Sequence, residues 1–262
     1  MPTTKQRREN ARRRLERQIQ RRQEAAAARK RRNLVMAAGL GVVVVIAAVV
    51  LVVTQVGGSD STPAAAPSAS ASASTATKGD CTYTKGSAAA TKNAGQPPNG
   101  KVATTGTATV NLVTTQGNMT FSLDRAKAPC TVNSFVFLAG HKYYDGTPCH
   151  RVTTGATFGV LQCGDPGGTG SGGPGYTFKD ELDPAGKYTT GVLAMANGGA
   201  NTNGSQFFIV YKNTQLDPNY TIFGTVTKGL DVVDKVAKAG AATGDDGKPK
   251  LAITLKTVTP AS

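Results

Sequence analysis

An uninterrupted apolar run, Leu34–Val53, divides this 262-residue chain and constrains its fold more than any other feature. The run contains no charged or strongly polar side chain. A helix of this length, rising about 1.5 Å per residue, matches the roughly 30 Å hydrocarbon core of a bilayer. Because only a helix satisfies its own backbone there, we expect one transmembrane helix over residues 34–56 and a separately folded domain beyond it.

The charges that flank this run predict its orientation. Residues 1–33 hold thirteen Lys and Arg against three Glu, and Arg29–Arg32 directly precedes the run. The positive-inside rule then predicts a single-pass protein of the cell membrane, with a cytoplasmic N-terminus and everything after residue 56 outside the cytoplasm. A cleaved signal peptide is the alternative, but its apolar region is only about 7–15 residues long. We therefore favour an uncleaved signal-anchor.

The basic tail, residues 1–33, has two candidate partners. Basic residues near a membrane attract anionic lipid at about 1 kcal/mol each, and a basic run also displaces counterions from nucleic acid. The tail has no aromatic residue to stack on bases, and the predicted span is adjacent to it. We therefore expect it to bind anionic membrane lipids and no nucleic acid.

The segment after the span is poor in apolar residues. Residues 57–78 are a Ser/Ala/Pro/Thr tract that lacks the apolar content to fold, and residues 86–106 show little periodicity. We expect residues 57–106 to form a stalk and a loose N-terminal extension. Residues 107–262 then form the compact domain.

Hydrophobic periodicity in residues 107–262 predicts mostly strands. Alternating apolar residues on both sides of Gln116–Asn118 predict a β-hairpin. Ala128–Thr131 opens a helix that Gly140 ends, and a second helix is expected over Leu230–Ala239. Further strands are expected at Pro148–Thr153, Val160–Cys163, Gly191–Met195, Gln206–Val210, Thr221–Val226 and Leu251–Leu255. With too few helices for parallel crossovers, the fold class is mainly β, an eight-stranded antiparallel closed barrel capped by two α-helices.

Several chemistries do not fit the residues present. The chain has two His, no HExxH and no paired CxxC, which predicts that it holds no metal. The run Gly167–Gly175 lacks the Lys-Ser/Thr of a phosphate-binding loop, and no GxSxG elbow offers a nucleophilic Ser. What remains is Arg151 on a predicted strand and the amide-rich Asn201–Gln206, which leads into Phe207–Ile209. These groups suit the binding of an extended peptide, or a reaction that breaks no covalent bond.

Blocks spread over roughly residues 107–259 closely resemble the cyclophilins. They are Cys149–Val152, Leu161–Asp165, Gly168–Gly170, Leu193–Asn197, Asn201–Ile209, Ile222–Val226 and the helix in Gly229–Val236. The run NTNGSQFFI within them is highly specific. The basic tail, span and stalk resemble those of membrane-anchored bacterial cyclophilins.

The resemblance implies a peptidyl-prolyl cis/trans isomerase that needs no cofactor and binds proline-containing polypeptides in a groove on the outer surface of the barrel. Arg151 matches the family's catalytic arginine, which would act on a barrier of about 18–20 kcal/mol to rotation of the amide. The expected substrate-binding residues are the proline pocket of Met195, Phe208 and Leu216, a further aromatic wall from Phe158, the polar Gln162 and Gln206, Asn197 with its neighbour Ala196, and Tyr220. We expect the protein to be a monomer.

The chain departs from the family's usual pattern in two places. Thr153–Gly159 is longer than the usual link between the arginine and glutamine strands. Gln215 stands where many cyclophilins have Trp, and Tyr220 stands where they often have His. The change at Gln215 bears on cyclosporin binding rather than on isomerase activity.

Four cysteines, Cys81, Cys130, Cys149 and Cys163, would face an oxidising exterior in the predicted topology, and they allow three pairings. Cys149 and Cys163 lie on strands expected to be neighbours, which would leave Cys81 with Cys130. Strict alternation argues against the Cys149–Cys163 pair, because Arg151 and Gln162 must share the groove face, which would place Cys149 and Cys163 on opposite faces. A bulge in the link between the strands would remove this conflict. We expect at least one disulfide, with the pairing left open.

The leading hypothesis is therefore a folding catalyst for exported proteins that acts at X-Pro bonds without a covalent intermediate. The alternative is a peptide-binding or chaperone module in which isomerisation is incidental. A third, a cytoplasmic nucleic-acid protein with a basic tail, requires the opposite topology.

Overall fold

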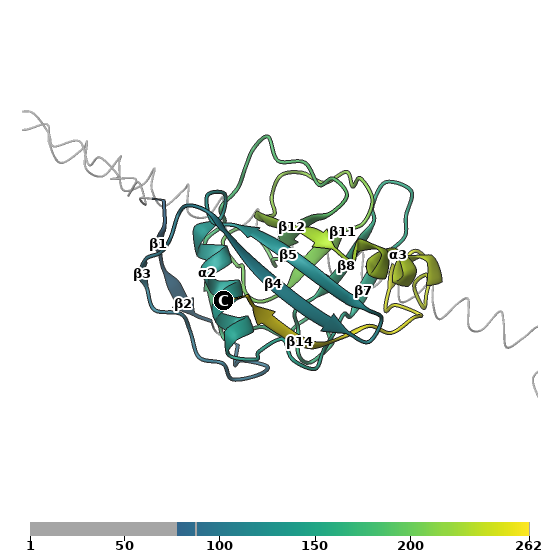
Figure 1. Cartoon of the computed structure of the whole chain (residues 1–262), viewed down its shortest axis with the longest axis horizontal. Helices are drawn as coiled ribbons and strands as arrows, with labels where there is room; N and C mark the ends of the chain where they lie inside the picture. The colour runs from purple at the N-terminus through teal and green to yellow at the C-terminus, as the bar shows by residue number, and fades with distance from the viewer. Residues whose placement is uncertain (1–77, 87, 262) are drawn as a thin grey trace, which may run out of the picture. The chain divides into compact units, whose positions relative to one another are not determined.

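The computed structural model describes residues 78–86 and 88–261 (Figure 1). The predicted basic tail, the transmembrane helix over residues 34–56 and the stalk up to residue 77 lie outside the described residues. Within the described ranges, none of the helices is long and apolar enough to cross a membrane.

A ten-stranded antiparallel sheet forms the body of the domain. Its hydrogen-bonded order is β13-β7-β8-β11-β10-β12-β5-β4-β14-β6. The strands are β13 (Asp246–Gly247), β7 (Arg151–Thr153), β8 (Val160–Cys163), β11 (Phe207–Val210), β10 (Val192–Met195), β12 (Ile222–Lys228), β5 (Asn118–Asp124), β4 (Thr107–Thr114), β14 (Thr254–Pro260) and β6 (Thr147–Pro148). The predicted hairpin is confirmed as β4 and β5, which lie side by side at the front of Figure 1.

The sheet curls but does not close into the expected barrel. Among the described residues, no ladder joins β6 at one end of the sheet to the strands at the other end. β6 and β7 belong to one segment that is interrupted at Cys149 and His150. The Cys149 N–H donates to the carbonyl of Ile253 (3.0 Å), next to β14, whereas the His150 N–H donates to the carbonyl of Gln162 (3.1 Å) on β8. Because the segment changes neighbour at this break, β6 forms one edge of the sheet while β7 lies next to β13 at the other edge. The result is an open ten-stranded half-barrel instead of a closed eight-stranded barrel.

Two helices cover opposite ends of the curled sheet, α2 (Pro129–Gly140) and α3 (Leu230–Ala239) (Figure 1). Their bounds confirm the helices expected from the sequence. Phe135 of α2 enters the core, where its ring centroid lies 5.3 Å from that of Phe207 and 5.5 Å from that of Phe223. All three side chains are buried. Edge-on and tilted phenylalanines thus build a core that contains no Trp.

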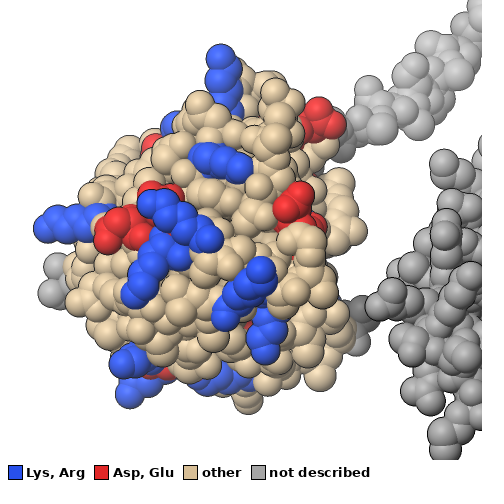
Figure 2. Space-filling model, turned by 90° about the vertical axis from the view of Figure 1, so that its right-hand side faces the viewer, with Lys and Arg blue, Asp and Glu red and all other residues tan. Residues whose placement is uncertain are grey.

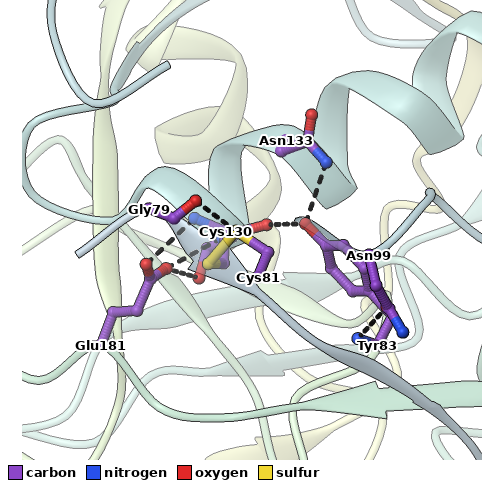
Figure 3. The surroundings of a disulfide bond; sticks show 8 residues. Gly79, Cys81, Tyr83, Asn99, Cys130, Asn133 and Glu181 are labelled. Atoms are coloured by element: carbon purple, nitrogen blue, oxygen red, sulfur yellow. Dashed lines mark hydrogen bonds between the residues drawn. A yellow bond between two sulfur atoms is a disulfide. The ribbon is translucent and has the colours of Figure 1, made fainter. Parts of the chain in front are cut away.

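Residues 78–106, expected to be part of a loose extension, are instead folded onto the domain. They contribute β1 (Asp80–Cys81), β2 (Tyr83–Lys85) and β3 (Gly100–Lys101), of which β2 pairs with β9 (Tyr176–Phe178). A disulfide joins Cys81 to Cys130 of α2, and the Tyr83 hydroxyl donates to the carbonyl of Cys130 (2.8 Å) (Figure 3). Tyr83 is only 2% exposed. These contacts join residues distant in sequence, so local periodicity gave no sign of them.

Glu181 lies beside the same disulfide in Figure 3 and caps α2. Its carboxylate accepts hydrogen bonds from the backbone N–H groups of Cys130 (2.9 Å) and Thr131 (2.8 Å), and from the Thr131 hydroxyl (2.8 Å). The N-cap residue, Ala128, offers no side-chain cap. An acidic side chain distant in sequence therefore satisfies the free N–H groups of the first turn.

The second disulfide joins Cys149 to Cys163, whose Cα atoms lie 4.0 Å apart. Cys149 lies in the break between β6 and β7, outside the ladder in which Arg151 pairs with Gln162. Strict alternation therefore does not apply to Cys149, and the objection raised from the sequence is removed.

Candidate functional site

Arg151 lies at the end of a row of residues that crosses four strands. The register pairs Arg151 of β7 with Gln162 of β8, Gln162 with Phe208 of β11, and Phe208 with Ala194 of β10. Residues directly opposite each other in a sheet share a face. The sheet therefore brings a cation, an amide and an aromatic ring together from three segments of the chain.

Beside this row the structure has a pocket of about 150 Å³. Eight of the predicted site residues line it, and they are Arg151, Phe158, Gln162, Ala196, Asn197, Phe208, Leu216 and Tyr220. Val160 is the ninth lining residue, and sequence reasoning missed it. Val160 lies two residues before Gln162 on β8, so strand alternation alone places both on one face.

Met195 was expected in the proline pocket and does not line it. This residue is 2% exposed and packs in the main core. Its neighbour Ala194 instead belongs to the small apolar cluster that contains Phe208. Since successive side chains on β10 point to opposite faces, the two cannot both reach the pocket.

Aromatic contacts hold the apolar wall of the pocket in place. The ring of Phe208, which is 5% exposed, lies edge-on to that of Tyr220 with centroids 5.6 Å apart. The ring centroid of Tyr188 lies 6.0 Å from that of Phe208, and the Tyr188 hydroxyl donates to the carbonyl of Tyr220 (2.9 Å). These contacts fix a rigid apolar surface.

A chain of amide hydrogen bonds runs along the polar side. Arg151 Nη1 donates to Gln162 Oε1 (3.1 Å), and Gln162 Nε2 donates to Gln206 Oε1 (2.9 Å). Gln206 Nε2 in turn donates to the carbonyls of Gly170 (3.0 Å) and Gly172 (2.9 Å). Gln206 lies outside the pocket itself but fixes the orientation of the amide that contacts Arg151.

The glycine-rich loop that anchors Gln206 is organised by Asp165. This carboxylate accepts hydrogen bonds from the backbone N–H groups of Gly167 (2.8 Å), Gly170 (2.8 Å) and Gly172 (3.2 Å). Burial acts to raise the pKa of Asp165, but these hydrogen bonds and those from Thr169 hold the pKa below its usual value. The loop is a structural support of the groove.

The side-chain amide of Asn197 is held by neighbouring groups. Its Nδ2 donates to the carbonyl of Asn219 (3.2 Å), and its Oδ1 accepts from the N–H of Gly199 (3.3 Å). Within the part of the chain that the structure describes, the backbone N–H and C=O of Asn197 have no hydrogen-bond partner. They are available to pair with an extended peptide.

A second cavity, of about 400 Å³, adjoins the first. The two share Gln162, Ala196 and Asn197. The glycine-rich loop, residues of the N-terminal extension including Ala88 and Ala89, and parts of the segment Gly198–Gln206 line the rest of it. The Gly86 N–H donates to the carbonyl of Gly175 (2.8 Å), which holds the extension against the loop.

Electrostatics at the site centre on Arg151. The hydrogen bonds from its guanidinium to Asp246 raise the pKa of Arg151 above its usual value, so the group stays charged. Figure 2 shows the face that carries α3, where basic and acidic side chains are interspersed among uncharged ones.

Within residues 78–86 and 88–261, no cluster of three or more His, Cys, Asp or Glu side chains could hold a metal ion.

Comparisons with known proteins show relatives of this chain. The chain is 46% identical over 194 residues to "Probable peptidyl-prolyl cis-trans isomerase B" of Mycobacterium leprae, covering 68% of this chain and 66% of that one. A relative of the same name in Mycobacterium tuberculosis is also 46% identical, with 68% and 63% covered. The chain thus spans slightly less than two thirds of the length of these relatives.

Solved structures are similar over the domain. A cyclophilin-type peptidyl-prolyl cis-trans isomerase of Cryptosporidium parvum is 34% identical with a TM-score of 0.54, covering 60% of this chain and 99% of that one. The same protein solved in the presence of the dipeptide Ala-Pro has a TM-score of 0.52, with 34% identity and 59% and 99% covered. Residues 109–259, more than half of the chain, match the family "Cyclophilin type peptidyl-prolyl cis-trans isomerase/CLD". The chain belongs to the cyclophilin family.

Proposed function

We propose that the domain accelerates cis/trans isomerisation of X-Pro peptide bonds. The observation that carries the proposal is the position of the Arg151 guanidinium at an apolar pocket closed by Phe208. A related cyclophilin was solved in the presence of Ala-Pro, a dipeptide with a proline ring of the kind this pocket would take.

The geometry supports a mechanism without covalent chemistry. Rotation about a prolyl bond faces a barrier of about 18–20 kcal/mol because the amide is conjugated. A guanidinium has five N–H donors. Three donors of Arg151 are engaged by Asp246 and Gln162, which leaves two for the substrate. Donation to the prolyl nitrogen stabilises the twisted, deconjugated state more than either planar state, and this difference lowers the barrier.

The other site residues hold the substrate while the bond rotates. Phe208 and Leu216 contact the proline ring, and the free backbone groups of Asn197 pair with the flanking peptide. Because the residues on both sides of the X-Pro bond are held, the binding energy orients the reacting amide for rotation.

We further propose that the enzyme works on exported proteins at the outer face of the cell membrane. The charge of residues 1–33 and the apolar run Leu34–Val53 support an anchored, extracytoplasmic domain, with anionic lipid as the partner of the tail. The two disulfides are in keeping with an oxidising compartment. Protease added to intact cells should remove the domain, and its survival there would contradict this topology.

The activity is tested by Arg151→Ala in the full chain with a proline-containing peptide. Loss of the donor should lower kcat/KM by about 100-fold or more. Arg125→Ala is the matched control, since Arg125 does not line the pocket, and it should retain activity. Unchanged turnover in Arg151→Ala would refute the mechanism, and peptide binding without any turnover by the wild type would favour a chaperone module instead.

A further inference from the structure

Asp246 reaches the site from the outermost strand of the sheet. The two-residue strand β13 pairs with β7, with Asp246 opposite Thr153 and Gly247 opposite Val152. The N–H of Thr154 also donates to the carbonyl of Asp245 (2.7 Å). This short ladder has no role in the main core, yet it places one carboxylate against Arg151.

The contact between the two side chains is bidentate. Arg151 Nε donates to Asp246 Oδ1 and Arg151 Nη2 donates to Asp246 Oδ2, both at 2.7 Å. Two parallel charge-assisted bonds fix the plane of a guanidinium, which a single bond does not. The remaining edge of Arg151 carries Nη1, which contacts Gln162 and the pocket.

The ion pair has little to offer stability. The side chains are 35% exposed for Arg151 and 54% exposed for Asp246, and exposed pairs contribute at most about 1 kcal/mol. The ion pair matters more for the orientation of Arg151, because rotation of the guanidinium would move its donors away from the reacting amide. A displacement of about 1 Å at a reacting centre costs up to 100-fold in rate.

We propose that Asp246 is a positioning residue for isomerisation, which acts by fixing the guanidinium plane of Arg151 so that its free N–H groups face the prolyl bond. The inference rests on the proposed isomerase function. It assigns a role to a residue that does not line the pocket and lies 95 positions from Arg151 in sequence.

The test compares Asp246→Ala, Asp246→Glu and Asp245→Ala in the full chain, with kcat and KM measured by NMR exchange on a proline-containing peptide. Asp246→Ala should lower kcat on the order of tenfold while KM changes less than about twofold, because the pocket itself is untouched. Asp246→Glu restores a carboxylate and should recover part of the loss. Asp245→Ala should behave as wild type, since among the described residues the Asp245 carboxylate hydrogen-bonds only to the Thr154 hydroxyl (3.4 Å).

Each result separates the inference from the function on which it rests. An active wild type with the same kcat in Asp246→Ala overturns the positioning role alone. Equal losses in kcat and in peptide affinity, or no recovery in Asp246→Glu, also overturn it, because they indicate general disruption of the site. An inactive wild type overturns the proposed function and this inference with it.

Discussion

Removal of the Cys81–Cys130 disulfide should destabilise the domain more than removal of Cys149–Cys163. The two bridges join residues 49 and 14 positions apart. If a disulfide stabilises by restricting the unfolded chain, these loops correspond to about 4 kcal/mol and about 3 kcal/mol respectively. The expected difference in the free energy of unfolding is therefore about 1 kcal/mol.

The contacts around Cys81–Cys130 in the folded state also predict that its removal costs more stability than removal of Cys149–Cys163. β1 and β3 pair with each other inside the N-terminal extension, and among the described residues the ladder that ties the extension to the rest of the domain is β2–β9, with three paired positions. Without Cys81–Cys130, the extension is held by this short ladder, by Tyr83 and by hydrogen bonds to the glycine-rich loop such as that from Gly86 N–H to Gly175. By contrast, Cys149 and Cys163 flank the β7–β8 ladder, which remains when their bridge is removed.

The assay is urea unfolding of the full chain, with both cysteines of one bridge changed to Ala in each variant. The chain has no Trp and its seven Tyr lie between Tyr83 and Tyr220, so tyrosine fluorescence reports on this domain. A fall in midpoint at constant slope measures the loss of stability. Lower stability of the Cys149/Cys163 variant than of the Cys81/Cys130 variant, or wild-type stability of both, would refute the reasoning.

Three further outcomes follow from the structure. In the part of the chain that the structure describes, both ring nitrogens of His150 are buried without a hydrogen-bond partner, and burial lowers the pKa of His150. Between this lowered pKa and the usual one, the unfolded chain therefore binds a proton that the folded chain does not. Stability should therefore be full above about pH 6.5 and fall as the pH drops toward the lowered pKa; His150→Phe should lose this dependence in urea titrations, and the exposed His141→Gln should keep it. Glu181→Ala should lower the free energy of unfolding by about 1 kcal/mol through loss of the α2 cap, and an unchanged midpoint would contradict that role. Ala89→Phe should raise KM for long peptides roughly tenfold without changing kcat, and an unchanged KM would show that the second cavity is not used.

Hydrophobic periodicity predicted the elements that form mainly through contacts between residues close in sequence. The β4–β5 hairpin follows from alternation around a short turn, and α2 and α3 follow from apolar stripes with clear ends. The last strand was expected at Leu251–Leu255 but runs over Thr254–Pro260. Its Thr-rich second half has weak alternation and is fixed instead by pairing with β4.

The misses at the site have a common physical cause. Arg151, Gln162 and Phe208 lie together at the pocket because the register aligns the strands that carry these family motifs, and their roles stay predictions. Met195 was misplaced because the resemblance gave the residue without its face of the strand. Asp246 had no local signal at all, since only the β13–β7 ladder brings it to Arg151.

The open edge of the sheet explains why Arg151 depends on such a distant contact. Gln162 and Phe208 lie on β8 and β11, which have neighbours on both sides, so the ladder itself fixes their positions. Arg151 begins β7, directly after the break at which the segment changes neighbour, and only the two residues of β13 lie beyond it. Backbone pairing is therefore sparse next to the residue that must be placed most accurately. Substitution of Phe208 on β11 should consequently change substrate affinity, whereas substitution of Asp246 on β13 should change turnover.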